Sequence, residues 1–192
     1  MSCLKLTACP LQVALLLLCI AIPAHAQYES GATTRVDSST LRRVYQRWLV
    51  EDVRWIITPE EQIAFLRLSN DADRDRFIEQ FWDRRNPHPD RPGNPFKDEH
   101  YRRIAYTNAH FASAGVPGWE TDRGRIYILY GPPDRIHDGY TNTADRKPAQ
   151  RWHYHFVGPY DVYDKDFRFV DVCNCGDYRL VAGRSEEPRL GP

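Results

Sequence analysis

The run from Gly118 to Asp134 constrains the fold of this chain most tightly, because turn-forming residues stand at both of its ends. Between these ends, residues 126–130 are apolar at every position, which predicts a strand buried on both faces and central in its sheet. The two prolines that follow Gly131 supply no backbone N–H and fix φ near −65°. We therefore expect the predicted strand to stop at Gly131.

The same run carries a family resemblance. The pentapeptide Gly-Trp-Glu-Thr-Asp at 118–122, continued by Arg-Gly-Arg-Ile-Tyr-Ile-Leu-Tyr-Gly-Pro-Pro-Asp, resembles the GWxTD domain family of exported bacterial domains. The segments 81–87, 94–96 and 101–104 are similar to the part of the family that precedes the pentapeptide, although Asn86 stands where relatives usually have Asp. The resemblance implies an exported domain and supplies no reaction. The candidate motif residues are Gly118, Trp119, Thr121, Asp122, Arg123, Gly124, Tyr130, Gly131, Pro132 and Asp134.

Trp119 and Asp122 allow two interpretations of the pentapeptide. In the structural one, Trp119 fills the junction between helices and sheet, and Asp122 fixes the start of the strand through local hydrogen bonds or an arginine partner. In the functional one, the pentapeptide is a recognition surface, since Trp, Tyr and Arg dominate binding hot spots. The second interpretation predicts an exposed Trp119.

The N-terminus has the pattern of a secretory signal peptide. Lys5 supplies the positive charge, residues 11–22 form the apolar core, and Ala-His-Ala at 24–26 predicts cleavage after Ala26. The apolar run is shorter than the ~20 residues of a membrane span. A lipid-modified form would use Cys19, but the bulky Leu18 before it disfavours this alternative. We expect a periplasmic or secreted protein without an integral membrane span.

Composition fits one domain without a nucleic-acid partner. The chain is 42% hydrophobic, and its formal net charge is zero, with acidic and basic residues interleaved. We expect four segments: a signal peptide at 1–26, a flexible leader at 27–38, a GWxTD-like domain at 39–182 and a tail at 183–192.

Helix signals fill the first half of the domain. Apolar residues three and four apart predict an amphipathic helix over 41–49, and the β-branched and aromatic run 53–57 predicts an extended piece. Thr58 followed by Pro-Glu-Glu predicts a capping box. Asn70 (or Ser69) and Asn94 are predicted to cap two further helices.

Strand signals fill the second half. Segments 151–157, 167–172 and 178–181 are predicted strands, with a polar loop over 137–149 and a turn at 173–177. Short connections favour an antiparallel arrangement. The predicted fold is α+β, with N-terminal amphipathic helices packed on a C-terminal antiparallel β-meander of 3–5 strands.

Two residue pairs suggest a disulfide or a metal site. Cys173 and Cys175 are the cysteines that remain after signal cleavage, and an oxidising compartment favours their pairing. His153 and His155 lie two apart on a predicted strand, so both point to the same face. These four side chains could in principle hold zinc, but their spacing matches no standard zinc motif. We therefore expect no metal and no cofactor.

The sequence lacks the hydrolase patterns Gly-x-Ser-x-Gly and His-Glu-x-x-His, and it lacks a glycine-rich phosphate loop. The predicted function is an exported, non-catalytic envelope domain that binds a protein partner or organises an assembly. The alternative is a metal-dependent or hydrolytic envelope enzyme, for which His100, His137, Asp134 and Asp138 could be gathered in a cleft. An inert spacer is a third possibility that the sequence does not separate from the first.

Overall fold

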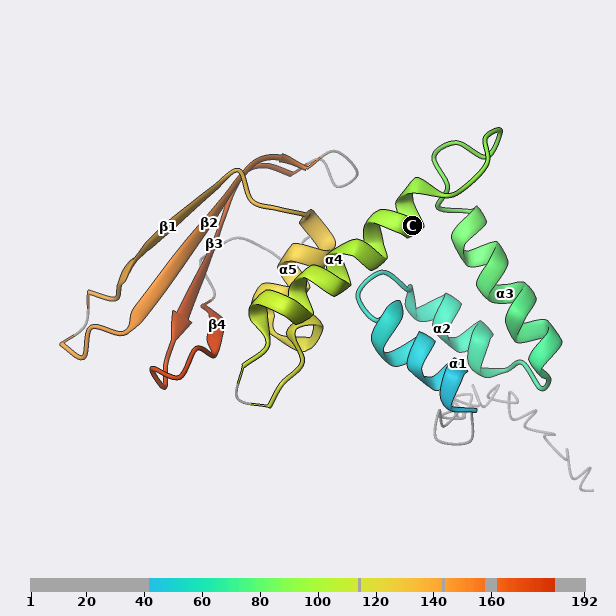
Figure 1. Cartoon of the computed structure of the whole chain (residues 1–192), viewed down its shortest axis with the longest axis horizontal. Coiled ribbons are helices and arrows are strands. Elements are labelled where there is room, and N and C mark those ends of the chain that lie inside the picture. The colour runs from blue at the N-terminus through green and yellow to red at the C-terminus, as the bar shows by residue number, and fades with distance from the viewer. Residues whose placement is uncertain (1–41, 114, 143, 158–161, 182–192) are drawn as a thin grey trace, which may run out of the picture. The chain divides into compact units, whose positions relative to one another are not determined.

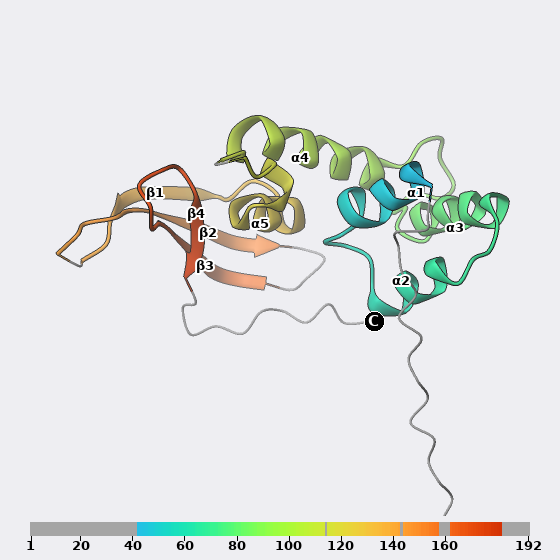
Figure 2. The ribbon, with the colours of Figure 1, turned by 90° about the horizontal axis from the view of Figure 1, so that it is seen from below.

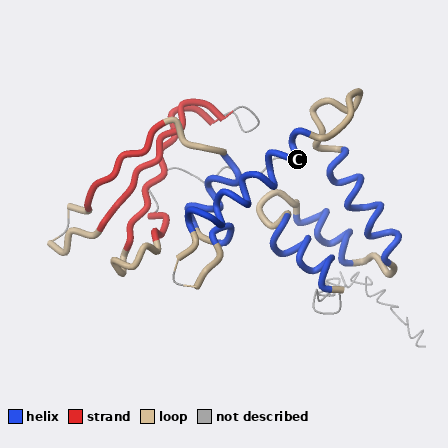
Figure 3. Tube along the Cα trace, in the orientation of Figure 1, coloured by secondary structure: helices blue, strands red, loops and turns tan. Residues whose placement is uncertain are grey.

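The computed structural model of the protein describes residues 42–113, 115–142, 144–157 and 162–181, and its helices precede its strands (Figures 1 and 3). The predicted signal peptide, leader and tail lie outside the described residues. The helical elements are α1 (Arg43–Arg47), a π-helical turn η2 (Trp48–Asp52), α2 (Pro59–Leu66), α3 (Asp71–Asp83), α4 (Pro95–Phe111), a 3-10 turn η3 (Gly118–Glu120) and α5 (Asp122–Tyr130). Within the described residues, no helix is long and apolar enough to cross a membrane.

The predicted helix starts are confirmed. The Thr58 side chain accepts a hydrogen bond from the Glu61 N–H, and the Glu61 carboxylate accepts one from the Thr58 N–H, which completes the capping box of α2. The side chains of Asn70 and Asn94 cap α3 and α4 in the same manner. Helix α4 ends at Phe111, four residues before Gly115.

The extended piece predicted over 53–57 is wrong. The chain makes a turn there, in which the N–H groups of Ile56 and Ile57 both donate to the Val53 carbonyl at 2.9 Å. Val53 is fully buried and Ile56 is buried in the same apolar cluster as Trp48, Phe65 and other side chains of α1–α3. Tertiary burial, rather than a sheet, accounts for the apolar β-branched residues here.

The C-terminal part is one antiparallel sheet in the order β1-β2-β3-β4, as the predicted meander requires. Its strands are β1 (Arg135–Tyr140), β2 (Pro148–Val157), β3 (Val162–Asp171) and β4 (Tyr178–Val181). The loop predicted over 137–149 is wrong at both ends, because β1 occupies its beginning and β2 starts at Pro148. β1 is hard to recognise in the sequence because most of its residues are polar or glycine. All of its residues are exposed, so no alternation of buried and exposed side chains marks it as a strand.

The central strand predicted over 126–130 is also wrong, because this segment is helix α5. Ile126, Tyr127, Ile128 and Tyr130 are all buried, so the segment lacks the polar face whose period would separate a helix from a strand. The predicted end is correct: Gly131 follows α5 with a φ of +82°, a conformation that glycine adopts without steric cost.

Helix α5 lies against one face of the sheet (Figures 1 and 2). Trp152 and Tyr154 of β2 and Phe169 of β3 point to this face and pack with Ile126 and Tyr127 of α5. His153 and His155 alternate with them and lie on the outer face, as predicted. The sheet therefore has one buried aromatic face and one face that carries polar side chains.

Candidate functional site: the pentapeptide frame and the β1 edge

Two glycines of the motif allow close backbone contacts. A Cβ at Gly118 would lie 1.8 Å from the Thr107 carbonyl oxygen of α4, and a Cβ at Gly124 would lie 1.8 Å from the Gly118 carbonyl oxygen. Neither position has room for a side chain. The backbones of α4, η3 and α5 are thus stacked directly on one another.

Thr121 begins α5 and ties it to η3. Its hydroxyl donates to the Gly118 carbonyl at 2.8 Å and accepts from the Gly124 N–H at 3.0 Å. This side chain satisfies one of the backbone N–H groups that a helix leaves unpaired at its start. Both bonds are buried, so the turn and the helix are held as one unit.

Trp119 is only 8% exposed. Its backbone N–H donates to Asn108 Oδ1 at 3.0 Å, and its carbonyl accepts from Trp55 Nε1 at 2.9 Å. The Arg54 guanidinium lies 5.6 Å from the centre of its ring. The burial agrees with the structural interpretation, and the exposure that the functional interpretation predicts is not found.

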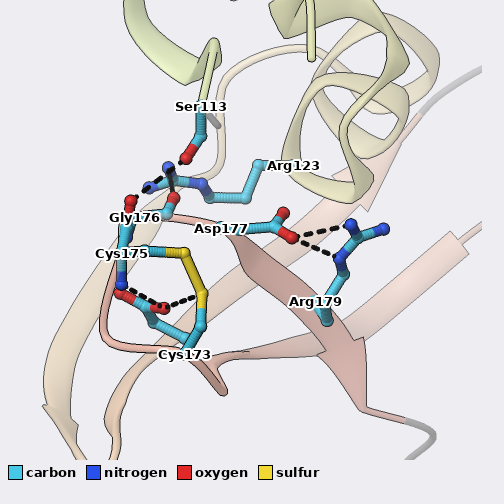
Figure 4. Close-up of a disulfide and its surroundings, with 8 residues drawn as sticks. Ser113, Arg123, Cys173, Cys175, Gly176, Asp177 and Arg179 are labelled. Atoms are coloured by element: carbon cyan, nitrogen blue, oxygen red, sulfur yellow. Dashed lines mark hydrogen bonds and ion pairs between the residues drawn. A yellow bond between two sulfur atoms is a disulfide. The ribbon is translucent and has the colours of Figure 1, made fainter. Parts of the chain in front are cut away.

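Asp122 and Arg123 connect α5 to the sheet. Asp122 Oδ2 accepts a hydrogen bond at 2.8 Å from the Leu180 N–H, so this carboxylate occupies part of the open edge of β4. Arg123 donates to the Gly176 carbonyl at 3.3 Å (Figure 4). Its guanidinium carbon lies 4.2 Å from the centre of the Tyr178 ring. Burial lowers the pKa of Arg123 from its ordinary value.

In the pentapeptide, Glu120 is the residue that faces solvent. Its carboxylate lies 3.5 Å from the Arg54 guanidinium.

The far end of α5 is held by Arg103 of α4. Its guanidinium donates to the Ile128 carbonyl at 3.0 Å and to the Leu129 carbonyl at 3.4 Å, where the negative end of the helix dipole favours a cation. The Gly131 carbonyl accepts from the buried Tyr154 hydroxyl at 2.9 Å, and burial raises the pKa of Tyr154. Of the remaining motif residues, Tyr130 packs on Tyr154 and Phe167, Asp134 accepts from the His155 N–H at 2.7 Å, and Pro132 is exposed.

A small cavity of about 110 Å³ lies beside this helix end. It is lined by Ile56, Phe96, Glu99, His100, Arg103, Ile128 and Leu129. Ligand sites usually measure ~300–1,000 Å³, so this cavity does not suit a substrate of ordinary size. His100 is buried and its Nε2 lies 2.6 Å from the Asp52 carbonyl, which is a structural hydrogen bond.

Cys173 and Cys175 form a disulfide in the turn between β3 and β4 (Figure 4). The Asp171 carboxylate accepts from the N–H groups of Cys175 and Gly176 at 3.0 and 2.7 Å, and Ser113 donates to the Cys175 carbonyl. The turn is thereby fixed to the chain that follows α4. This is the disulfide that the sequence suggests.

The four metal ligands considered from the sequence are not gathered into one site. His153 and His155 lie with Asp164, whereas Cys173 and Cys175 lie with Asp171. Because both sulfurs are also bonded to each other, the combined His-Cys zinc site is not formed.

The outer edge of β1 is a surface that the sequence did not reveal. Ile136 pairs with Trp152 and therefore points to the same side of the sheet as α5, yet it is 50% exposed. Tyr140 lies on the same side, by alternation along the strand, and is 60% exposed. The side of the sheet that packs on α5 thus continues to the edge with two exposed apolar side chains, and the Arg146 guanidinium lies 5.3 Å from the centre of the Tyr140 ring.

The hydrogen-bond alternation fixes which backbone groups of β1 face outward. The Thr141 N–H donates to the Lys147 carbonyl at 2.8 Å, one pair beyond the last pair of the β1–β2 ladder. Alternating residues of an antiparallel strand face the same neighbour. The N–H and C=O groups of Ile136, Asp138 and Tyr140 are therefore directed away from β2. We call this row, with the Ile136 and Tyr140 side chains, the β1 edge.

Comparison with known proteins identifies one family. The sequence model of the GWxTD domain matches residues 25–185. No curated protein and no solved structure matches the chain significantly.

Proposed function

This chain belongs to the GWxTD domain family, and we propose that it works as an exported, non-catalytic interaction domain of the bacterial envelope. The single observation that carries the proposal is the β1 edge, where outward-directed backbone groups and two exposed apolar side chains lie together. The partner is an extended segment of another envelope protein, which adds a strand to the sheet beside β1. Backbone hydrogen bonds give such binding its affinity, and alternate side chains give its specificity.

The chemistry of the β1 edge defines the partner segment. An added strand would place every second side chain on the α5 side of the sheet, next to Ile136 and Tyr140, so those positions of the partner are apolar. Asp138 lies between the two and accepts from Gln150 Nε2 at 2.8 Å. Between its two apolar positions, the partner segment therefore has a residue that can lie next to the Asp138 carboxylate.

The internal contacts of the pentapeptide support the same proposal. Gly118, Trp119, Thr121 and Asp122 are each used in internal contacts that join α4, α5 and β4. Their role is to hold the scaffold on which the sheet edge is displayed. Export is supported by the signal-like N-terminus, and a disulfide in the domain is typical of an oxidising compartment.

The experiment that tests this function is site-specific photo-crosslinking in the native envelope. A photoreactive residue in place of Ile136 is expected to give a discrete adduct with another envelope protein. The matched control is the same residue in place of Glu120, which is exposed but lies in the pentapeptide. The proposal fails if position 136 gives no adduct in folded, exported protein, or if position 120 gives the same adduct equally well.

A further inference from the structure

The outer face of the sheet carries a cluster of two histidines and two aspartates that the proposed function does not use. His153 and His155 belong to β2, and Asp164 and Asp166 belong to β3. These two strands are neighbours in the sheet (Figure 1). His153 stands directly opposite Asp166 in the antiparallel ladder. Strand pairing therefore places these two side chains together, and a contact of 2.9 Å between His155 Nδ1 and Asp164 Oδ1 joins the other two.

The hydrogen bonds of the cluster orient the imidazole of His153. Its Nδ1 lies 2.9 Å from Asp166 Oδ1, and the neutral tautomer that donates Nδ1–H to this carboxylate has its lone pair on Nε2. The Nε2 atom lies 3.9 Å from Asp164 Oδ1, and His155 Nδ1 lies 2.9 Å from the same oxygen. Ligand atoms of His153, His155 and Asp164 all lie within 4.8 Å of one another.

This arrangement has the two parts of a metal centre: a set of converging ligand atoms and a carboxylate behind one of them. Histidines that bind metal ions almost always donate their other ring N–H to a carboxylate or carbonyl, which fixes the ring and its tautomer. Asp166 stands in that relation to His153. Two imidazoles with one carboxylate suit transition-metal ions better than magnesium or calcium, which prefer oxygen ligands.

We propose that His153, His155 and Asp164 bind one divalent transition-metal ion of the zinc class, with Asp166 as a positioning residue for His153. The side chains of His155 and Asp164 are 75% and 70% exposed, so water can complete the coordination shell. This site is separate from the β1 edge, and the inference does not depend on the proposed interaction function.

The test is a calorimetric titration of the purified, untagged, chelator-treated protein with zinc chloride. We expect saturable binding of one ion per chain. His155→Ala and Asp164→Asn are each expected to weaken zinc binding at least ~10-fold. Asp166→Asn is expected to weaken it ~10-fold, because the His153 ring is then no longer oriented. His88→Ala, which removes an exposed histidine outside the cluster, should leave the affinity unchanged.

Two further measurements separate ligands from structural residues. The visible spectrum of the cobalt-substituted protein should change in Asp166→Asn and return in Asp166→Glu, whereas a merely structural role would leave this spectrum unaltered. The Cys173→Ser/Cys175→Ser variant should retain binding. The proposal is overturned if no saturable binding occurs, if His155→Ala binds as tightly as the original protein, or if the double cysteine variant alone loses the ion.

Discussion

Gly118 and Gly124 explain at the scale of single residues why the motif contains glycine at these places. Each lies so close to a neighbouring carbonyl oxygen that a methyl group would overlap it at 1.8 Å. Both close atoms belong to backbone, which cannot rotate aside as a side chain can. Thr121 and Asp122 then use their side-chain oxygens to fix the start of α5 and the edge of β4.

Gly118→Ala tests this close contact. The added methyl group must push η3 away from α4, and we expect a loss of about 3 kcal/mol or more in the free energy of unfolding. Gly139→Ala is the matched control, because a Cβ at Gly139 meets nothing within 4 Å. Urea denaturation of the two variants provides the comparison, and equal midpoints would contradict the packing described for Gly118.

Helix α5 shows at the scale of elements how far the sequence predicts this fold. The starts of α2, α3 and α4 were predicted correctly because each depends on a local signal, such as Thr58 with Glu61 or Asn94 with its following proline. The pattern of segment 126–130 predicts a strand, which is wrong, because burial on every side removes the polar face of the helix. Whether this segment forms a helix or a strand depends on its packing against α4 and the sheet, and no local sequence pattern indicates that packing.

The candidate site was harder to predict than the fold. The sequence singles out Trp119, whereas the candidate surface is β1, whose histidine, aspartate and glycine at 137–139 favour the prediction of a loop. Its importance comes from its place in the ladder: Ile136 matters because it pairs with Trp152 at an edge of the sheet. Likewise, the side-chain partners of His153 and His155 are aspartates of the next strand, and the register that places Asp166 opposite His153 is not visible in the sequence.

The contact between α4 and α5 also makes the stability of the folded state depend on pH. Hydrogen bonds from Arg102, supported by Arg103, lower the pKa of Glu99 from 4.5 to about 2. Since the carboxylate is favoured in the folded state, its contribution is present above the unfolded pKa and is lost as the pH falls from about 4.5 towards 2. Arg103 also holds the end of α5, so this contribution stabilises the junction of the two helices.

Glu99→Gln should remove this acid-sensitive part of the stability. Because Glu99 is partly exposed, we expect a loss below about 1 kcal/mol at pH 7 and a smaller difference from the original protein near pH 2.5. Urea denaturation at both pH values measures the two differences. Glu79→Gln, on an exposed position of α3, is the control. A difference that grows towards low pH would contradict the assignment.

The described part of the domain consists of a helical frame and a four-stranded sheet whose two edge strands, β1 and β4, differ in how they are covered. Asp122 accepts from an outward-directed N–H of β4, whereas β1 exposes all of its residues at the opposite edge. Edge strands are usually protected by charges, proline or a covering segment, since their free backbone groups pair readily with other chains. The exposed Ile136 and Tyr140 make β1 the edge at which a partner strand gains most apolar contact.

Asp138→Pro tests strand addition at β1 most directly. The Asp138 N–H is directed away from β2, so proline at this position leaves the β1–β2 ladder intact and removes a donor that an added strand requires. Asp138→Ala is the matched control, because both variants lose the hydrogen bond from Gln150 and only one loses the backbone donor.

The measurement is crosslinking from position 136 in both variants, with urea denaturation to confirm that each remains folded. We predict that the adduct disappears in Asp138→Pro and persists in Asp138→Ala. An adduct of undiminished yield in folded Asp138→Pro would contradict strand addition at the β1 edge.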